Sequence, residues 1–275
     1  MTKKRLDELL VDKNLIETND KAKRIIMAGL VFSEQNRLDK PGMKVDESIP
    51  ITIKGRSIPY VGRGGLKLKK ALNHFSITAT GKTMLDVGSS TGGFTDCALQ
   101  NGALLSYAVD VGYNQLDWKL RNDDRVIVME RTNFRYVTPD MLRHGTPNLA
   151  SIDVSFISLK LILPVLKNLL TPNGDVIALI KPQFEAHRDE VGNKGIVRDK
   201  RVHQRVLKKI IEFATDEQYE LYDLTHSPIT GGDGNIEFLV YLGWKKPNRG
   251  RIITDQELEQ KVDEAHGELN SIARK

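Results

Sequence analysis

Apolar residues occur along most of the chain in two alternating patterns, short continuous runs and amphipathic stretches at helical spacing. The short runs predict strands at 83–87, 104–109, 126–130, 149–153, 175–181, 220–225 and 236–242. Helices are predicted between them, notably at 158–170 and 202–213. Strands and helices that alternate at this spacing predict an α/β fold, a mostly parallel sheet with helices on both faces.

The first sixty residues follow a different pattern. Leucines and isoleucines at helical spacing predict two short helices, and 49–54 alternates like a half-buried strand. A unit of this size usually offers a surface rather than a deep pocket. Glycines and a proline between 55 and 65 mark a joint. The predicted organisation is therefore a small α+β domain at 1–60, a linker and leading helix at 61–80, the large domain at 81–245 and a helical tail at 246–275.

A glycine-rich loop follows the first strand of the large domain. Asp86 ends the strand, and the loop leads directly into a predicted helix. Strand, loop and helix in this order are typical of a nucleotide-binding unit, although the three spaced glycines of dinucleotide sites are absent. A second acid, Asp110, lies about 20 residues further on, where it can accept hydrogen bonds from ribose.

The two acids fit S-adenosylmethionine as well as a nicotinamide cofactor, and a plain β-turn with two capping acids is the alternative. Thr132 and Asn133 follow the third strand and are candidates to flank an adenine. The candidate cofactor residues are Asp86, Gly88, Ser89, Ser90, Thr91, Gly92, Gly93, Phe94, Asp110, Val111, Thr132, Asn133 and Asp153.

Four charged residues occupy positions that the fold brings to one edge of the sheet. Asp153 and Lys181 end strands, Glu237 begins the last strand, and Lys67 lies just before the large domain. Four separate surface charges are the alternative, because that is the usual fate of such residues. Lys181, however, follows five apolar residues, so it should be partly buried and needs an anionic partner or the loss of its proton.

These residue types suit the transfer of a methyl group from a sulfonium to a ribose 2′-hydroxyl. A lysine that has lost its proton can accept one from the attacking hydroxyl. We therefore expect Lys181 to act as base or proton relay and Lys67 to hold the hydroxyl or the adjacent phosphate. Asp153 and Glu237 would orient the lysines and balance their charge.

The net charge of +5 and the pI near 9.1 weakly favour a polyanionic partner. Basic residues open the predicted first helix and lie on the second, and RNA phosphates would suit them as well as a solvated face would. The candidate RNA-binding residues are Lys3, Lys4, Arg5, Lys21, Lys23, Arg24 and, at the joint, Arg63.

The sequence has one cysteine, and we find neither a signal peptide nor a membrane-spanning segment in it. These features predict a cytoplasmic protein. The histidines lack the spacing of metal ligands, so we expect no metal site.

Two resemblances carry these expectations further. The segments 5–10, 21–31 and 39–42 resemble the small RNA-binding domain first described in a ribosomal small-subunit protein, although the loop at 32–37 lacks the usual glycine turn. In that family, two helices carry basic residues to structured RNA. The resemblance therefore implies an RNA-binding role for the small domain.

The loop at 86–97 is similar to that of the FtsJ-like ribose methyltransferases, and the whole chain resembles the TlyA, or hemolysin A, family. Supporting segments occur in order at 61–68, 108–113, 130–133, 153–158, 181–185 and 231–238. The family implies a Rossmann-like class I methyltransferase fold, S-adenosylmethionine as cofactor, and 2′-O-methylation of cytidine in ribosomal RNA, within ribosomal subunits. It also implies a catalytic tetrad of Lys67, Asp153, Lys181 and Glu237.

Two departures from the family and three rival functions remain. Gly62 stands where the family more often has serine, and the joint lacks the tryptophan-containing tetrapeptide of the mycobacterial members. The rivals are a non-catalytic RNA-binding assembly factor, a membrane-lytic protein and a nicotinamide enzyme. The complete tetrad argues against the first, the lack of a convincing membrane helix against the second, and the glycine spacing against the third.

Overall fold

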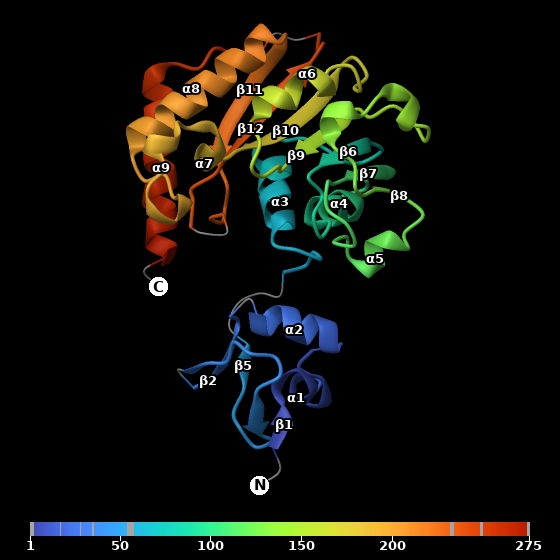
Figure 1. Cartoon of the computed structure of the whole chain (residues 1–275), viewed down its shortest axis with the longest axis vertical. Coiled ribbons are helices and arrows are strands. Elements are labelled where there is room, and N and C mark those ends of the chain that lie inside the picture. The colour runs from blue at the N-terminus through green and yellow to red at the C-terminus, as the bar shows by residue number, and fades with distance from the viewer. Residues whose placement is uncertain are drawn as a thin grey trace. The chain divides into compact units, whose positions relative to one another are not determined.

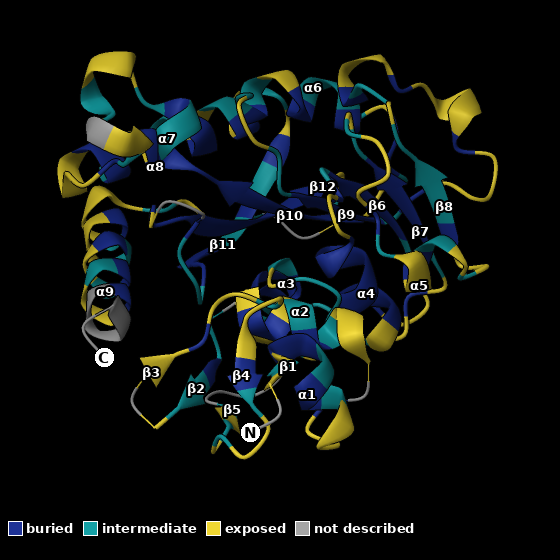
Figure 2. Ribbon diagram, turned by 60° about the horizontal axis from the view of Figure 1, so that its bottom comes forward, coloured by how far each residue is buried: buried dark blue, intermediate teal, exposed yellow. Residues whose placement is uncertain are grey.

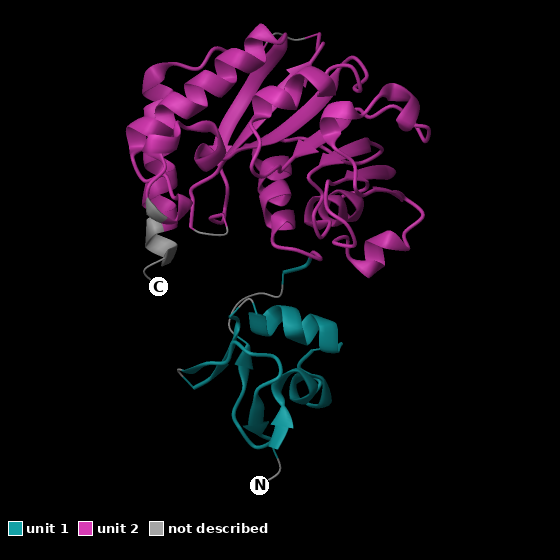
Figure 3. Ribbon diagram, in the orientation of Figure 1, with its two compact units in different colours: residues 1–59 teal, residues 60–275 magenta. Residues whose placement is uncertain are grey.

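The computed structural model describes residues 3–273 except 17, 28, 35, 54–57, 232–233 and 248–249. The chain divides into two compact units, residues 1–59 and residues 60–275 (Figure 3). Some positions used in the sequence predictions lie outside the described residues: Gln35, Lys54, Gly55, Gly232 and Asp233.

The first unit packs two helices against short strands. The helices are α1 (Leu6–Asp12) and α2 (Asn19–Met27), and the strands are β1 (Lys3–Arg5), β2 (Val31–Ser33), β3 (Asn36–Arg37), β4 (Lys44–Asp46) and β5 (Thr52–Ile53). β1 pairs with β4, and β2 lies between β3 and β5. The helical spacing of the apolar residues is confirmed, because Leu6, Leu10, Ala22 and Ile26 are fully buried in one core.

The prediction that Lys3, Lys4 and Arg5 open the first helix is wrong. They form β1, and α1 begins only at Leu6. The first turn of α1 instead carries two acids, Asp7 and Glu8, which interact favourably with the positive end of the helix dipole.

The second unit is built around a seven-stranded sheet (Figure 1). Its strands are β6 (Thr83–Val87), β7 (Leu105–Val109), β8 (Val126–Met129), β9 (Leu149–Ile152), β10 (Gly174–Ile180), β11 (Tyr219–His226) and β12 (Phe238–Trp244). Their order is β11-β12-β10-β9-β6-β7-β8. β12 runs antiparallel to both neighbours, and the pairs from β10 to β8 are parallel, so the expected mostly parallel sheet is confirmed.

Helices cover both faces of this sheet. The first face carries α3 (Gly64–His74), α4 (Gly93–Gln100) and α5 (Trp118–Arg121), and the second carries α6 (Leu163–Leu166), α8 (Lys200–Asp216) and α9 (Asp255–Ala273). Alternate residues of β10 enter the two cores, so that strand is buried along its whole length (Figure 2). A continuous apolar run is what a strand covered on both faces requires.

The predicted helix at 158–170 is wrong in its length. The chain there forms a 3₁₀ turn at Leu159–Leu161 and then the single short helix α6. Pro164 has no N–H to donate to a preceding turn, so it fits the first turn of α6 but disfavours the interior of one long helix over 158–170. Glu237 also lies directly before β12 rather than inside the strand.

The C-terminal segment packs into the same unit as the sheet. α9 contacts α8 and β11, and its residues Leu258, Val262, Ala265 and Leu269 are buried in the core on that side. None of the helices in the described part of the chain combines the length and apolar composition that are needed to span a membrane.

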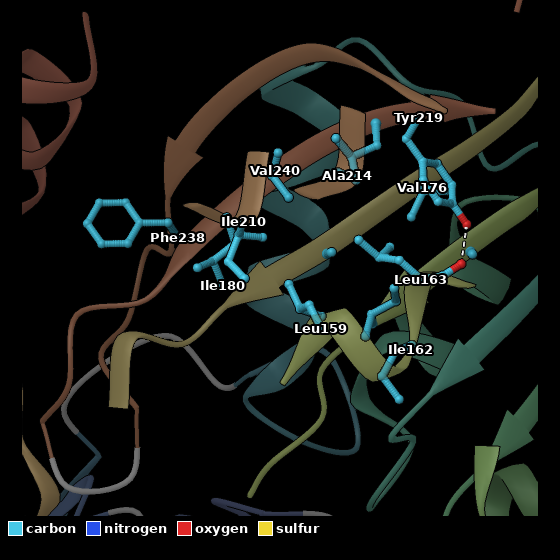
Figure 4. Close-up of a cluster of buried hydrophobic side chains, with 14 of the residues drawn as sticks. Leu159, Ile162, Leu163, Val176, Ile180, Ile210, Ala214, Tyr219, Phe238 and Val240 are labelled. Atoms are coloured by element: carbon cyan, nitrogen blue, oxygen red, sulfur yellow. Dashed lines mark hydrogen bonds between the residues drawn. The ribbon is translucent and has the colours of Figure 1, made fainter. Parts of the chain in front are cut away.

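A buried hydrogen bond crosses the core on the α8 side. The hydroxyl of Tyr219, on β11, donates to the carbonyl oxygen of Leu163, on α6, at 2.9 Å (Figure 4). Tyr219 is 1% exposed, and burial raises the pKa of its hydroxyl far above the ordinary value. The bond therefore ties α6 to the outermost strand from inside the core.

We expect Tyr219→Phe to lower the free energy of unfolding by about 1 kcal/mol, because one buried hydrogen bond is lost without loss of the ring. Urea denaturation followed by circular dichroism measures the change. Tyr222→Phe on the same strand is the matched control, because its hydroxyl donates to the side chain of Glu220, at 3.4 Å, and not to the carbonyl oxygen of Leu163. Equal effects of the two substitutions would contradict the assignment.

Candidate active site

The candidate site lies at the carboxyl edge of the sheet, where β6 has β7 on one side and β9 on the other. Ligands of open α/β sheets bind at such a switch point. A cavity of about 430 Å³ opens there. Its lining includes residues of the glycine-rich loop, the four predicted catalytic residues and several others: Arg63, Gly64, Lys67, Gly88, Ser89, Ser90, Thr91, Gly93, Phe94, Asp153, Ser155, Phe156, Lys181, Gln183, Phe184, Gly231, Asn235 and Glu237.

The glycine-rich loop needs glycine at position 88. Gly88 has φ of +84°, and a Cβ there would lie 2.7 Å from the carbonyl oxygen of Asp153. The amides of Gly88 and Ser89 both donate to the carbonyl oxygen of Val109, at 2.9 and 3.1 Å. The loop is therefore held against the ends of β7 and β9, where its backbone lines the cavity.

Asp86 is buried beneath this loop and does not line the cavity. One carboxylate oxygen accepts from the amide and hydroxyl of Thr95, at 3.1 and 2.7 Å, and the other accepts from the hydroxyl of Ser151, at 2.9 Å. Burial raises the pKa of Asp86 to about 6, and the hydrogen bonds from Thr95 and Ser151 oppose that rise. The carboxylate thus fastens β6 to α4 and β9, and it can influence a cofactor only through the loop above it.

Asp110 lies at the end of β7, beside the loop. Its carboxylate accepts from the amides of Ser90 and Gly112, at 2.8 and 2.7 Å. Each carboxylate oxygen has a further lone pair, so both remain able to accept from a ribose hydroxyl. Val111, the next residue, is 71% exposed and offers an uncovered apolar side chain at the same sheet edge.

Thr132 and Asn133 follow β8. The amide of Thr132 donates to the carbonyl oxygen of Asp110 at 2.9 Å, which places Thr132 next to the end of β7. Asn133 accepts from the amide of Arg135, at 3.1 Å, and so caps the short helical turn at 134–136. Both residues lie outside the cavity lining, on the side where Asp110 stands.

The structure brings the four predicted catalytic residues into one network. The ammonium of Lys67 lies 2.8 Å from Glu237 Oε2 and 3.3 Å from Asp153 Oδ2. The ammonium of Lys181 lies 2.5 Å from Asp153 Oδ1 and donates to the hydroxyl of Ser155 at 3.1 Å. Asp153 therefore stands between the two lysines.

The network is buried and its charges balance. Lys67, Lys181 and Glu237 are 5%, 7% and 2% exposed, and two ammonium groups face two carboxylates. Burial alone would raise the pKa of Asp153, but the charges of Lys67 and Lys181 lower it below its ordinary value. The anionic partner that the sequence predicted for a buried Lys181 is thus Asp153.

Gly231 lies opposite Glu237 and leaves room for its carboxylate. A Cβ on Gly231 would lie 2.6 Å from Glu237 Oε1. Gln183 approaches the same carboxylate oxygen, with its Nε2 at 3.5 Å. Glu237 is therefore held by Lys67 on one oxygen and bordered by Gly231 and Gln183 on the other.

Several residues that line the cavity had no role in the sequence predictions, among them Ser155, Phe156 and Gln183. Phe156 is 90% exposed with φ of +63°, and its ring centroid lies 5.0 Å from that of Phe184. The available signal was its position three residues after Asp153, in Asp153-Val154-Ser155-Phe156.

One of the predicted RNA-binding residues lies in the second unit, and the other six lie in the first. Arg63 is exposed and lines the cavity. In the first unit, Lys4 forms an ion pair with Asp12, and Arg5 contacts the buried Asp7 at 2.8 Å. The remaining candidates are the exposed or half-buried residues Lys3, Lys21, Lys23 and Arg24.

The loop backbone and the polar side chains at the cavity fit a nucleoside cofactor. No group of three or more His, Cys, Asp or Glu side chains suited to a metal occurs in the described part of the chain. The glycine-rich loop lines the cavity, the carboxylate of Asp110 can accept from ribose hydroxyls, and Val111 offers an exposed apolar side chain. These features fit the adenosine and sulfonium of S-adenosylmethionine.

Comparisons with known proteins agree with this geometry. The model of the FtsJ-like methyltransferase family matches residues 60–244. A candidate rRNA methyltransferase of Bacillus subtilis, YqxC, is 61% identical over 97% of this chain and 95% of its own length. The 16S/23S rRNA (cytidine-2′-O)-methyltransferase TlyA of Mycobacterium tuberculosis is 37% identical over 96% and 97%. A solved structure named as a candidate hemolysin, from Streptococcus thermophilus, is 49% identical with a TM-score of 0.79 over 100% of both chains.

The raised pKa of Asp86 predicts a pH-dependent contribution to stability. The folded protein binds this proton more tightly than the unfolded chain does, because the pKa rises from 3.8 to about 6. The residue therefore favours folding at low pH, and this contribution is lost as the pH rises through about 6. Asp86→Asn removes the titration and the buried charge.

The quantity to compare is the free energy of unfolding of Asp86→Asn minus that of the unchanged protein. We expect this difference to become about 2 kcal/mol more favourable to the variant between about pH 4.5 and about pH 7.5. Chemical denaturation at the two pH values gives this difference. The control is Asp124→Asn, which removes one exposed carboxylate and so makes the same change of net charge at the surface. A pH-independent difference for Asp86→Asn would show that the buried carboxylate titrates normally.

Proposed function

This chain belongs to the FtsJ-like methyltransferase family, and we propose that it transfers a methyl group from S-adenosylmethionine to the 2′-hydroxyl of a cytidine in ribosomal RNA. The observation that carries the proposal is the assembly of Lys67, Asp153, Lys181 and Glu237 beside the glycine-rich loop. The name of the mycobacterial relative indicates the nucleic acid and the nucleoside. The reaction would take place in the cytoplasm, where ribosomal RNA is found.

S-adenosylmethionine supplies the methyl group as part of a sulfonium, whose sulfur keeps the bonding electron pair when the methyl group leaves. The backbone of 88–93 would hold the methionine part, and Asp110 would accept from the ribose hydroxyls. Val111 would cover the adenine. The loop therefore directs the reactive end toward the cavity that contains the two lysines.

The charges of the network favour Lys181 as the proton acceptor. Lys67 is held by two carboxylates, whereas Lys181 is held by one carboxylate and a neutral hydroxyl. The four side chains are neutral overall when both lysines carry their protons. A sulfonium nearby adds one positive charge, and loss of one proton from Lys181 restores the balance.

In the reaction, the ribose oxygen forms a bond to the methyl carbon while its proton passes to the neutral Nζ of Lys181. Lys67 keeps its proton and can donate to the same ribose oxygen or to a neighbouring phosphate. Asp153 fixes both lysines, and Glu237 fixes Lys67. Much of the rate would come from holding the hydroxyl in line with the methyl group.

Two aromatic rings border the same cavity. Phe184, a candidate for stacking against a base, lies with its ring 5.9 Å from Lys181 Nζ. Phe156 packs beside it and is almost fully exposed. A nucleotide turned out of its helix could stack on these rings while Arg63, also at the cavity, contacts its phosphate.

The first unit would bind the phosphates of structured ribosomal RNA and would not contact the target base. The basic residues of α2 and Lys3 suit phosphate contacts, which position a protein on RNA without reading sequence. The substrate would be RNA within a ribosomal subunit, where structured helices are available for such contacts. An assembly factor without catalysis is less well supported, because all four tetrad residues are present and in contact.

We expect Lys181→Arg and Lys181→Ala each to reduce methyl transfer at least about 100-fold, because neither side chain can accept the ribose proton. Isothermal titration calorimetry should show nearly unchanged affinity for S-adenosylmethionine. The control is Lys160→Ala, which removes a lysine that stacks on Phe213 outside the cavity. Normal turnover by either Lys181 variant would refute the assigned role.

We expect the triple variant Lys21→Ala, Lys23→Ala and Arg24→Ala to bind ribosomal subunits more weakly and with a smaller dependence on salt, because phosphate contacts release counterions. Filter binding at several salt concentrations measures both effects. Lys200→Ala, Arg201→Ala and Lys208→Ala on α8 form a control with the same change of net charge. Equal losses in the two triple variants would mean that net charge, not the α2 surface, governs binding.

A further inference from the structure

We propose that the hydroxyl of Ser155 carries the proton from Lys181 to solvent after each methyl transfer. The proposal rests on the function proposed above and adds a proton-relay residue to it. Each methyl transfer to a hydroxyl releases one proton, and Lys181 must lose that proton before it can accept the next.

Lys181 has little direct access to water. It is 7% exposed, at the end of a strand that is buried along its length. Its ammonium has three N–H bonds, of which one faces Asp153 Oδ1 at 2.5 Å and one donates to Ser155 Oγ at 3.1 Å. The third is available to the ribose hydroxyl, because Lys181 lines the cavity. While the ribose occupies this third position, the proton can leave toward Asp153 or toward Ser155.

Asp153 is poorly suited to pass the proton on. Lys67 also contacts its carboxylate, at 3.3 Å, and the two lysines together keep its pKa below the ordinary value. A proton on Asp153 would weaken the contacts by which its carboxylate holds both lysines. Asp153 therefore orients Lys181 and does not store its proton.

Ser155 has the properties that a relay requires. It lies in the loop after β9, two residues past Asp153, and its side chain is exposed and lines the cavity. Its oxygen accepts from Lys181, which leaves its own O–H to point toward water. A hydroxyl that accepts on one side and donates on the other can move a proton without moving itself.

An Nζ–H bond of Lys181 breaks and its proton bonds to Ser155 Oγ, while the original Oγ–H proton passes to water or to a buffer base. Lys181 becomes a neutral amine, and rotation of the hydroxyl restores the starting arrangement. No oxidant, metal ion or further reactant is involved.

The test is steady-state methylation of ribosomal subunits by the full chain with Ser155→Ala and Ser155→Thr. We expect Ser155→Ala to lower kcat about tenfold, with KM for both substrates nearly unchanged. Higher concentrations of imidazole buffer should restore much of this loss, because a small base can enter and take the proton from Lys181. Ser155→Thr keeps a hydroxyl and should retain most of the turnover.

Ser158→Ala is the matched control, since the hydroxyl of Ser158 donates to Glu185 and not to the network. Any loss in that variant should be insensitive to imidazole. Normal turnover by Ser155→Ala would overturn the relay. A fall in kcat that imidazole does not restore, and that Ser155→Thr shares, would overturn it as well. Failure of the proposed function would appear separately, as absence of methylation by the unchanged chain.

Discussion

The buried contact between two lysines and two acids is the interaction on which the rest of the second unit depends. Burying a charge is costly unless an opposite charge and hydrogen bonds compensate for it. Here Asp153 lies between Lys67 and Lys181, and Glu237 completes the balance at Lys67. Loss of any one side chain would leave an unpaired charge inside the protein, so the four residues act as one unit in stability and in chemistry.

This network also explains features of the fold that have no obvious role by themselves. β12 runs antiparallel, which places its first residue opposite Ile180 at the carboxyl edge of β10 and brings Glu237 to the cavity. Gly88 leaves room for the backbone carbonyl of Asp153, and Gly231 leaves room for the carboxylate of Glu237. The leading helix α3 belongs to the same compact unit as the sheet, and it supplies Lys67 to the network.

The sheet and the tetrad could be predicted because both depend on local patterns. Continuous apolar runs identified the parallel strands, and charges at strand ends had to meet at one edge. The rest depends on contacts that are distant in sequence. Ser155 is 26 residues from Lys181, and Asp86 faces its partners inside the protein rather than the cofactor loop. Apolar spacing at 158–170 predicted one helix, but Pro164 limits what the backbone can form there.

The most direct test of the central claim is methyl incorporation from labelled S-adenosylmethionine into ribosomal subunits, followed by nuclease digestion and analysis of the nucleosides. The account predicts label on 2′-O-methylcytidine and none on the base. Label on a base, or on a ribose other than that of cytidine, would contradict the proposed placement of the target hydroxyl. No incorporation by a chain that binds S-adenosylmethionine would contradict ribosomal RNA as the substrate.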